Sequence, residues 1–128
     1  MPTYTVGTGK TYPTIHAALI AVPANLSGTG IHTIEVYAGG TNIGDGYYYA
    51  GMVDAFQGFS NFSGANNIVI VGMVPNLGER GRGIIVNVTQ SSPYGIWLGQ
   101  YCRVVDISVT GDGIFSAGIY FDVWAPIP

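Results

Sequence analysis

The sequence predicts an all-β protein, built as a short parallel β-solenoid with one helix near its N-terminus. Three observations support this fold class. Only one segment has helical periodicity, the rest of the chain reads as short strands between polar turns, and one strand pattern recurs after 21 to 23 residues. A repeat of this length, with two or three short strands in it, is typical of one coil of a solenoid.

Residues 1–30 are expected to form an N-terminal strand and a capping helix. Residues 3–6 alternate in the manner of a strand and lead into a glycine turn. Between residues 14 and 22 the apolar side chains recur at the spacing of one helix face, and Thr14 is a good N-cap. Pro23 ends this helix, because the residue before a proline is pushed out of the helical conformation.

Residues 31–128 are expected to form about three to four coils of strands, so that the whole chain makes a single domain. Each candidate strand is short, β-branched or aromatic, and bounded by Gly, Asn, Asp, Ser or Pro. No Asn-Gly or Asp-Gly pair joins two well-matched strands, which argues against a series of tight hairpins. The candidate strands are Thr33–Tyr37, Tyr48–Val53, Ile68–Gly72, Ile84–Thr89, Gly95–Leu98, Val104–Thr110 and Gly118–Val123.

The internal repeat predicts how two successive coils stack. The segment 84–89 aligns with 105–110, and each leads through a polar turn into a glycine, an isoleucine, an aromatic residue and a further hydrophobic residue, at 95–98 and 118–121. Alternate residues of these strands are expected to point into the core. The pairs expected to stack are Val86 with Ile107, Val88 with Val109, and Trp97 with Tyr120.

The composition excludes several classes of protein. Only 9% of the 128 residues are charged, against about 25% in an ordinary soluble domain, and the net charge is -3. So few cations cannot neutralise a phosphate backbone, so nucleic acid is not an expected partner. No apolar run is long enough to span a membrane, and the first residues lack the pattern of a signal peptide. The single cysteine, Cys102, is expected to be a small buried hydrophobic residue.

The N-terminal third carries a family resemblance. The run from Tyr4 to Leu19 contains a strand, a glycine turn and a T-I-x-x-A helix, and it resembles the opening of right-handed parallel β-helix proteins of the pectin-lyase-like superfamily. Segments 32–39 and 67–73 look like the next stacked strands of that family. The resemblance covers most of residues 4–123. It implies a right-handed β-helix whose helix shields the open strand edges of the first coil.

The sequence lacks the acid clusters that would support catalysis. Enzymes of the resembled family place two or three acids on one outward strand face. Here Asp106 is expected to stack on Ile85, Asp112 lies in a turn, and Asp122 lies on a different strand. A glycoside hydrolase needs paired carboxylates, and a Ca²⁺ site needs several oxygen ligands together. We therefore expect no catalytic residue, no metal and no cofactor.

Four aromatic residues are the candidate binding or interface residues. Tyr47, Tyr48 and Tyr49 follow one another, so at least one ring must face outward from a strand. Such rings would offer a flat apolar patch to a sugar ring or a protein partner. Trp124 precedes the proline-rich end of the chain, where prolines cannot extend a strand ladder.

These features together predict a non-enzymatic protein that works by assembly. The N-terminal end has an expected cap and the C-terminal end has none, while the sparse charge permits close packing of copies. The resemblance extends to β-helix modules of phage structural proteins. We therefore expect a decoration, cement or tail component at a virion surface or in another extracellular assembly, with copies of itself (a trimer is one arrangement) and other structural subunits as partners. Two alternatives stay open, a carbohydrate-active β-helix enzyme or fragment (polysaccharide lyase or esterase) and a glycan-binding module.

Overall fold

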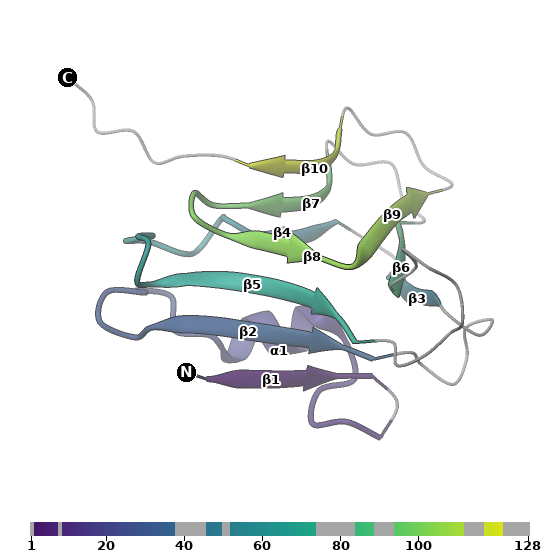
Figure 1. The fold of residues 1–128 in the computed structure, drawn as a ribbon, viewed down its shortest axis with the longest axis horizontal. Helices are drawn as coiled ribbons and strands as arrows, with labels where there is room; N and C mark the ends of the chain where they lie inside the picture. The colour runs from purple at the N-terminus through teal and green to yellow at the C-terminus, as the bar shows by residue number, and fades with distance from the viewer. Residues whose placement is uncertain are drawn as a thin grey trace.

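The described part of the chain consists mostly of strands, with one short helix (Figure 1). A computed structural model describes residues 2–7, 9–37, 46–49, 52–73, 84–88, 94–111 and 117–121. The expectation of a strand-rich chain with one short helix is therefore confirmed. The elements of the first half are β1 (Thr3–Val6), α1 (Ile15–Ala21), β2 (Ile31–Val36), β3 (Gly46–Tyr49), β4 (Val53–Ala55) and β5 (Asn67–Gly72). Those of the second half are β6 (Ile84–Val88), β7 (Tyr94–Leu98), β8 (Arg103–Val105), β9 (Ile107–Gly111) and β10 (Ala117–Phe121).

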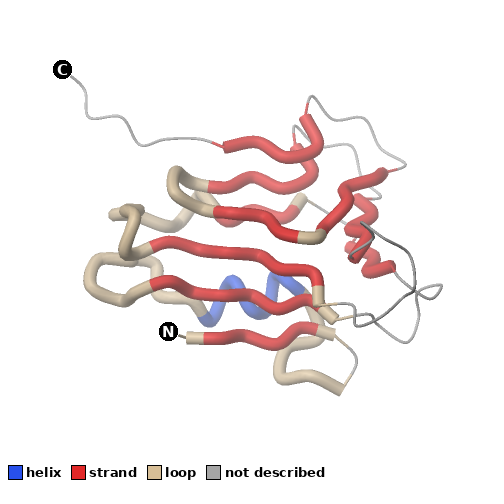
Figure 2. The backbone as a smooth tube through the Cα atoms, in the orientation of Figure 1, coloured by secondary structure: helices blue, strands red, loops and turns tan. Residues whose placement is uncertain are grey.

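The strands form three parallel sheets, and the chain visits them in a fixed order (Figure 2). The sheets have the strand orders β1-β2-β5-β8, β3-β6-β9 and β4-β7-β10. After β1 and α1, three successive passes of the chain run through β2-β3-β4, β5-β6-β7 and β8-β9-β10, and each pass adds one strand to each sheet. Every pairing between neighbouring strands is parallel. Strands that are far apart in the sequence therefore lie side by side.

The register of β6 with β9 corrects the predicted stacking. The structure pairs Ile84 with Ile107, Val86 with Val109 and Val88 with Gly111. The expected pairs Val86–Ile107 and Val88–Val109 are therefore wrong by two residues. A shift of two keeps the same side chains on the same face of a strand, so hydrophobic alternation alone cannot detect it. The expected pairing of Trp97 with Tyr120, between β7 and β10, is confirmed.

A bend at Asp106 corrects a second prediction. The single strand expected over 104–110 is two strands, β8 and β9, which belong to different sheets. Asp106 lies between them with a φ of 54°, a left-handed conformation that ends strand geometry. It therefore does not stack on Ile85, which pairs with Ser108 instead. The strand expected over 48–53 is likewise divided between β3 and β4.

Helix α1 begins and ends where the sequence indicates. Thr14 is the N-cap, and its hydroxyl oxygen accepts a hydrogen bond of 3.0 Å from the backbone amide of Ala17. The helix buries Ile15, Ala18 and Leu19 and packs against β1, β2 and β4. Within the described ranges, no helix is long and apolar enough to cross a membrane.

The core is built from alternate residues of stacked strands. Ile34 of β2 lies in register with Ile70 of β5, and both side chains are fully buried. In another sheet, Val53 of β4 and Ile96 of β7 pair in the same way. Stacked β-branched residues pack well on parallel strands that are covered on both faces.

Candidate functional site

The predicted aromatic residues are located only in part. Tyr47, Tyr48 and Tyr49 lie in β3, which pairs with β6, so the expectation that they occupy a strand is confirmed. The structure does not describe their side chains, and Trp124 lies outside the described residues. The proposed patch for a sugar ring or a protein partner therefore remains a prediction.

The last pass of the chain leaves three strand edges without a strand neighbour in the described part of the structure. β8, β9 and β10 are each the terminal strand of a sheet. Figure 1 shows them at the opposite end of the stack from β1 and α1. An edge strand presents backbone N–H and C=O groups that can pair with another chain. This end of the molecule is the first candidate site.

Burial falls from the middle of the stack toward this end. Ile96 of β7 is fully buried, whereas Ile119, its partner in β10, is 37% exposed. Ile70 of β5 is also fully buried, whereas Val104, its partner in β8, is only partly buried. Ile119 and Val104 therefore occupy positions in line with the core, and no described element covers them on the far side. We refer to β8, β9 and β10 as the uncovered end.

Helix α1 covers part of the opposite end of the stack. β4 is also the terminal strand of its sheet, but its side chains Val53 and Ala55 are buried. Helix α1 packs against β4 and supplies part of this cover. In the described part of the chain the two ends therefore differ, because a helix packs against one end and no element lies beyond the terminal strands of the other.

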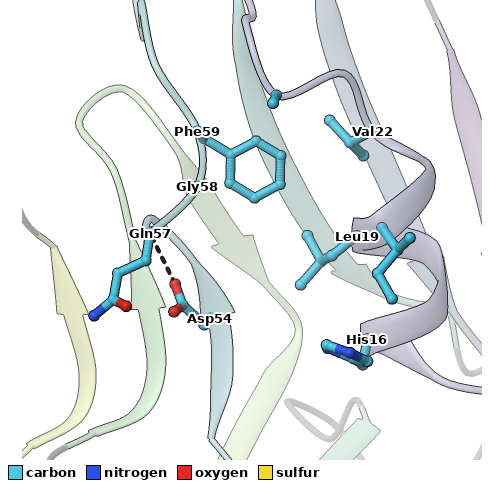
Figure 3. A pocket seen from close by; sticks show the side chains of 9 residues that line it. His16, Leu19, Val22, Asp54, Gln57, Gly58 and Phe59 are labelled. Atoms are coloured by element: carbon cyan, nitrogen blue, oxygen red, sulfur yellow. Dashed lines mark hydrogen bonds between the residues drawn. The ribbon is translucent and has the colours of Figure 1, made fainter.

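A groove of about 300 Å³ lies between α1 and the segment that follows β4 (Figure 3). Its floor is apolar, with Leu19, Val22 and Phe59 buried. His16 and Asp54 stand at its margin, on opposite sides in Figure 3. The sequence gives no sign of this groove, because its two walls come from separate segments, 16–24 and 54–59, that only tertiary packing brings together.

The carboxylate at the groove has a structural role. Asp54 Oδ1 accepts hydrogen bonds from the backbone amides of Phe56 at 2.9 Å and Gln57 at 2.8 Å. An aspartate that caps two successive amides in this way stabilises a turn. Asp54 therefore holds the chain in its turn after β4, and the groove offers an apolar hollow with no paired acids.

His32 is a buried residue at the centre of a half-buried hydrogen-bonded chain that the sequence did not reveal. Its ring is 1% exposed. Nδ1 lies 3.0 Å from the Tyr4 hydroxyl, and Nε2 lies 2.8 Å from the Thr29 hydroxyl. Burial lowers the pKa of His32 and raises that of Tyr4, so both groups are held in their neutral forms. The three residues come from β1, from the α1–β2 connection and from β2.

The described residues contain no cluster of three or more His, Cys, Asp or Glu side chains that could hold a metal ion. Cys102 is buried, as expected from the sequence, and burial raises the pKa of its thiol to about 11. A thiol with so high a pKa carries little thiolate near neutral pH, and the thiolate is the nucleophile. The geometry around Cys102 is therefore that of a packing residue.

No family model, curated protein or solved structure matches this chain. The features of this chain that bear on its function are therefore the two ends of the stack, the groove and the hydrogen-bonded chain at His32.

Proposed function

We propose that this chain is a non-enzymatic structural protein that works by assembly through its uncovered end. The observation that carries the proposal is the contrast between Ile96, which is fully buried, and its stacked partner Ile119, which is 37% exposed. A solenoid normally covers both of its ends, either with caps or with neighbouring subunits. Among the described elements, α1 packs against one end of the stack, and none lies beyond β8, β9 and β10 at the other.

The proposal includes a specific fold, a right-handed parallel β-helix of the pectin-lyase-like kind. The fixed order in which the chain visits three parallel sheets supports it, because each pass then corresponds to one coil. The position of α1 against β1, β2 and β4 agrees with the capping role that the family resemblance implies.

The expected partners are copies of the same chain and other structural subunits. Three parallel edge strands offer unpaired backbone groups, and partly exposed apolar side chains lie beside them. With only 9% of residues charged, repulsion between copies is weak. We place the protein at a virion surface or in another extracellular assembly, as a decoration, cement or tail component.

Analytical ultracentrifugation of the purified chain tests the assembly proposal. Over a series of protein concentrations, we expect the sedimentation coefficient to rise above the monomer value as copies associate. A stable, well-dispersed monomer throughout the series would contradict association between copies of this chain.

A second experiment tests the non-enzymatic part of the proposal. The chain is incubated with polygalacturonate, with and without Ca²⁺, and the products are examined for unsaturated sugars and released methanol. We expect neither product. The appearance of either one would favour a polysaccharide lyase or an esterase instead.

A further inference from the structure

The hydrogen bonds around His32 define its tautomer. The Thr29 hydroxyl lies 2.7 Å from the carbonyl oxygen of Leu26, to which it donates its only hydrogen. At 2.8 Å from His32 Nε2 it can therefore only accept, so Nε2 carries the proton. Nδ1 is then the acceptor for the Tyr4 hydroxyl at 3.0 Å. Every ring nitrogen of a neutral His32 is satisfied in this arrangement.

The hydrogen-bonded chain joins the terminal strand of a sheet to the body of the molecule. Tyr4 lies in β1, which is the edge strand next to β2. Besides the bond from Tyr4 to His32, the backbone amides of Thr33 and Tyr37 donate to the carbonyl oxygens of Pro2 at 3.0 Å and Val6 at 2.8 Å. Because His32 is 1% exposed, water reaches its ring only when β1 or the α1–β2 connection moves away.

We propose that His32 is a pH-sensitive latch, which holds β1 on β2 when its ring is neutral and favours release of β1 in mild acid. Release would uncover the edge of β2, which β1 covers in the closed state. This inference does not depend on the proposed assembly function, because it concerns the opposite end of the molecule.

The surroundings of His32 disfavour a positive charge on its ring. The groups that face it are the Tyr4 phenol from β1 and the Thr29 hydroxyl from the α1–β2 connection, and Tyr12 stands beside Tyr4 with ring centroids 5.9 Å apart. Ile68 is the paired residue of β5. No carboxylate of the described residues is hydrogen-bonded or ion-paired to the ring, so a buried imidazolium would lack a counter-ion.

The direction of the pH effect follows from these contacts. Burial lowers the pKa of His32 in the closed state, and the positive charge of the amino terminus lowers it further. In the open state the ring regains its ordinary pKa near 6.5. At pH values between the pKa of the open state and the lower pKa of the closed state, only the open state binds a proton on His32. The open population therefore grows by up to about tenfold for each pH unit of acidification in this window.

Amide hydrogen exchange measured on the full chain between pH 7.5 and pH 5 tests the latch. After correction for intrinsic exchange rates, we expect the protection of the Thr33 and Tyr37 amides, which donate to β1, to fall by up to about tenfold per pH unit below about pH 6.5. The Met73 amide donates across β2 and β5 to the carbonyl oxygen of Val36 at 2.7 Å. Its protection should stay constant and serves as the internal reference.

Two variants separate the latch from general acid sensitivity. In His32→Gln the pH dependence of Thr33 and Tyr37 protection should disappear, whereas it should persist in His16→Gln, in which an exposed histidine is replaced.

If His32→Gln does not fold, Tyr4→Phe keeps the aromatic ring and removes the bond to Nδ1. That variant should lower Thr33 protection at pH 7.5. Equal loss of protection at Thr33 and Met73, or pH-independent protection at all three amides, would overturn the proposal.

Discussion

At the scale of single residues, Gly99 shows how tightly the connection between β7 and β8 packs on the core. A Cβ atom built at this position would lie 2.6 Å from Cε1 of the Phe62 ring, which real Cβ atoms essentially never do. Phe62 cannot easily retreat, because its ring is buried beside Phe56 and Phe59 at centroid distances of 6.2 Å and 6.4 Å. The space beside Gly99 is therefore filled by an aromatic cluster.

We expect Gly99→Ala to lower the free energy of unfolding by about 1–3 kcal/mol, the usual cost of inserting a group into a packed core. Urea denaturation measures the change. Gly64→Ala is the matched control, since a Cβ at Gly64 would meet nothing within 4 Å. Equal changes in the free energy of unfolding for the two substitutions would show that the aromatic cluster can move aside without destabilising the protein.

The thiol of Cys102 offers a second test at this scale. Because it is buried and its pKa is raised to about 11, we expect a thiol-reactive dye to label the native protein at pH 8 far more slowly than the protein unfolded in urea. The absorbance of the released dye measures both rates. Rapid labelling of the native chain would mean that Cys102 is open to solvent.

At the scale of elements, α1 depends on its N-cap because it has only seven residues. Removing the Thr14 hydroxyl leaves the amide of Ala17 without the acceptor that now lies 3.0 Å away. We expect Thr14→Ala to destabilise the protein by about 1 kcal/mol, measured as a shift of the urea midpoint. Thr14→Ser keeps the hydroxyl and should stay close to the parent, whereas an equal loss in both variants would argue against a capping role.

The elements were predictable from the sequence where local chemistry alone determines them. The predicted bounds of β1 and α1 agree with the structure to within a residue, because strand alternation, a glycine turn, a threonine cap and a proline all lie within a few positions. The division between β8 and β9 was not predictable, because it depends on a left-handed backbone at Asp106. Aspartate adopts such a conformation more often than most residues other than glycine, but a single aspartate between two β-branched runs does not identify it.

At the scale of the whole molecule, the uncovered end was the part of the site that the sequence could indicate, through its succession of stacked strands after a single predicted helix. The groove and the His32 chain could not be predicted. His32 meets Tyr4 and Thr29 only after β1 has paired with β2, so no spacing in the sequence indicates their contact. Pairing between parallel strands creates these neighbours, and strand propensity does not specify which strands will pair.

The uncovered end predicts a difference between two exposed isoleucines. Ile119 lies on the terminal strand β10, whereas Ile20 is 71% exposed on α1, at the capped end. A lysine on an edge strand discourages pairing with another chain. We therefore expect Ile119→Lys to shift the sedimenting species toward monomer, while Ile20→Lys leaves association unchanged. Loss of association in Ile20→Lys alone would move the interface to the helix.

The spacing between paired strands has a consequence for how such a protein can diversify. Ile96 of β7 lies 43 residues after its partner Val53 in β4, yet only 23 residues before its partner Ile119 in β10. The same sheet therefore accepts connecting segments of very different length with no change in how its strands align. Inserted or exchanged sequence between strands would then alter what the molecule displays while its scaffold persists.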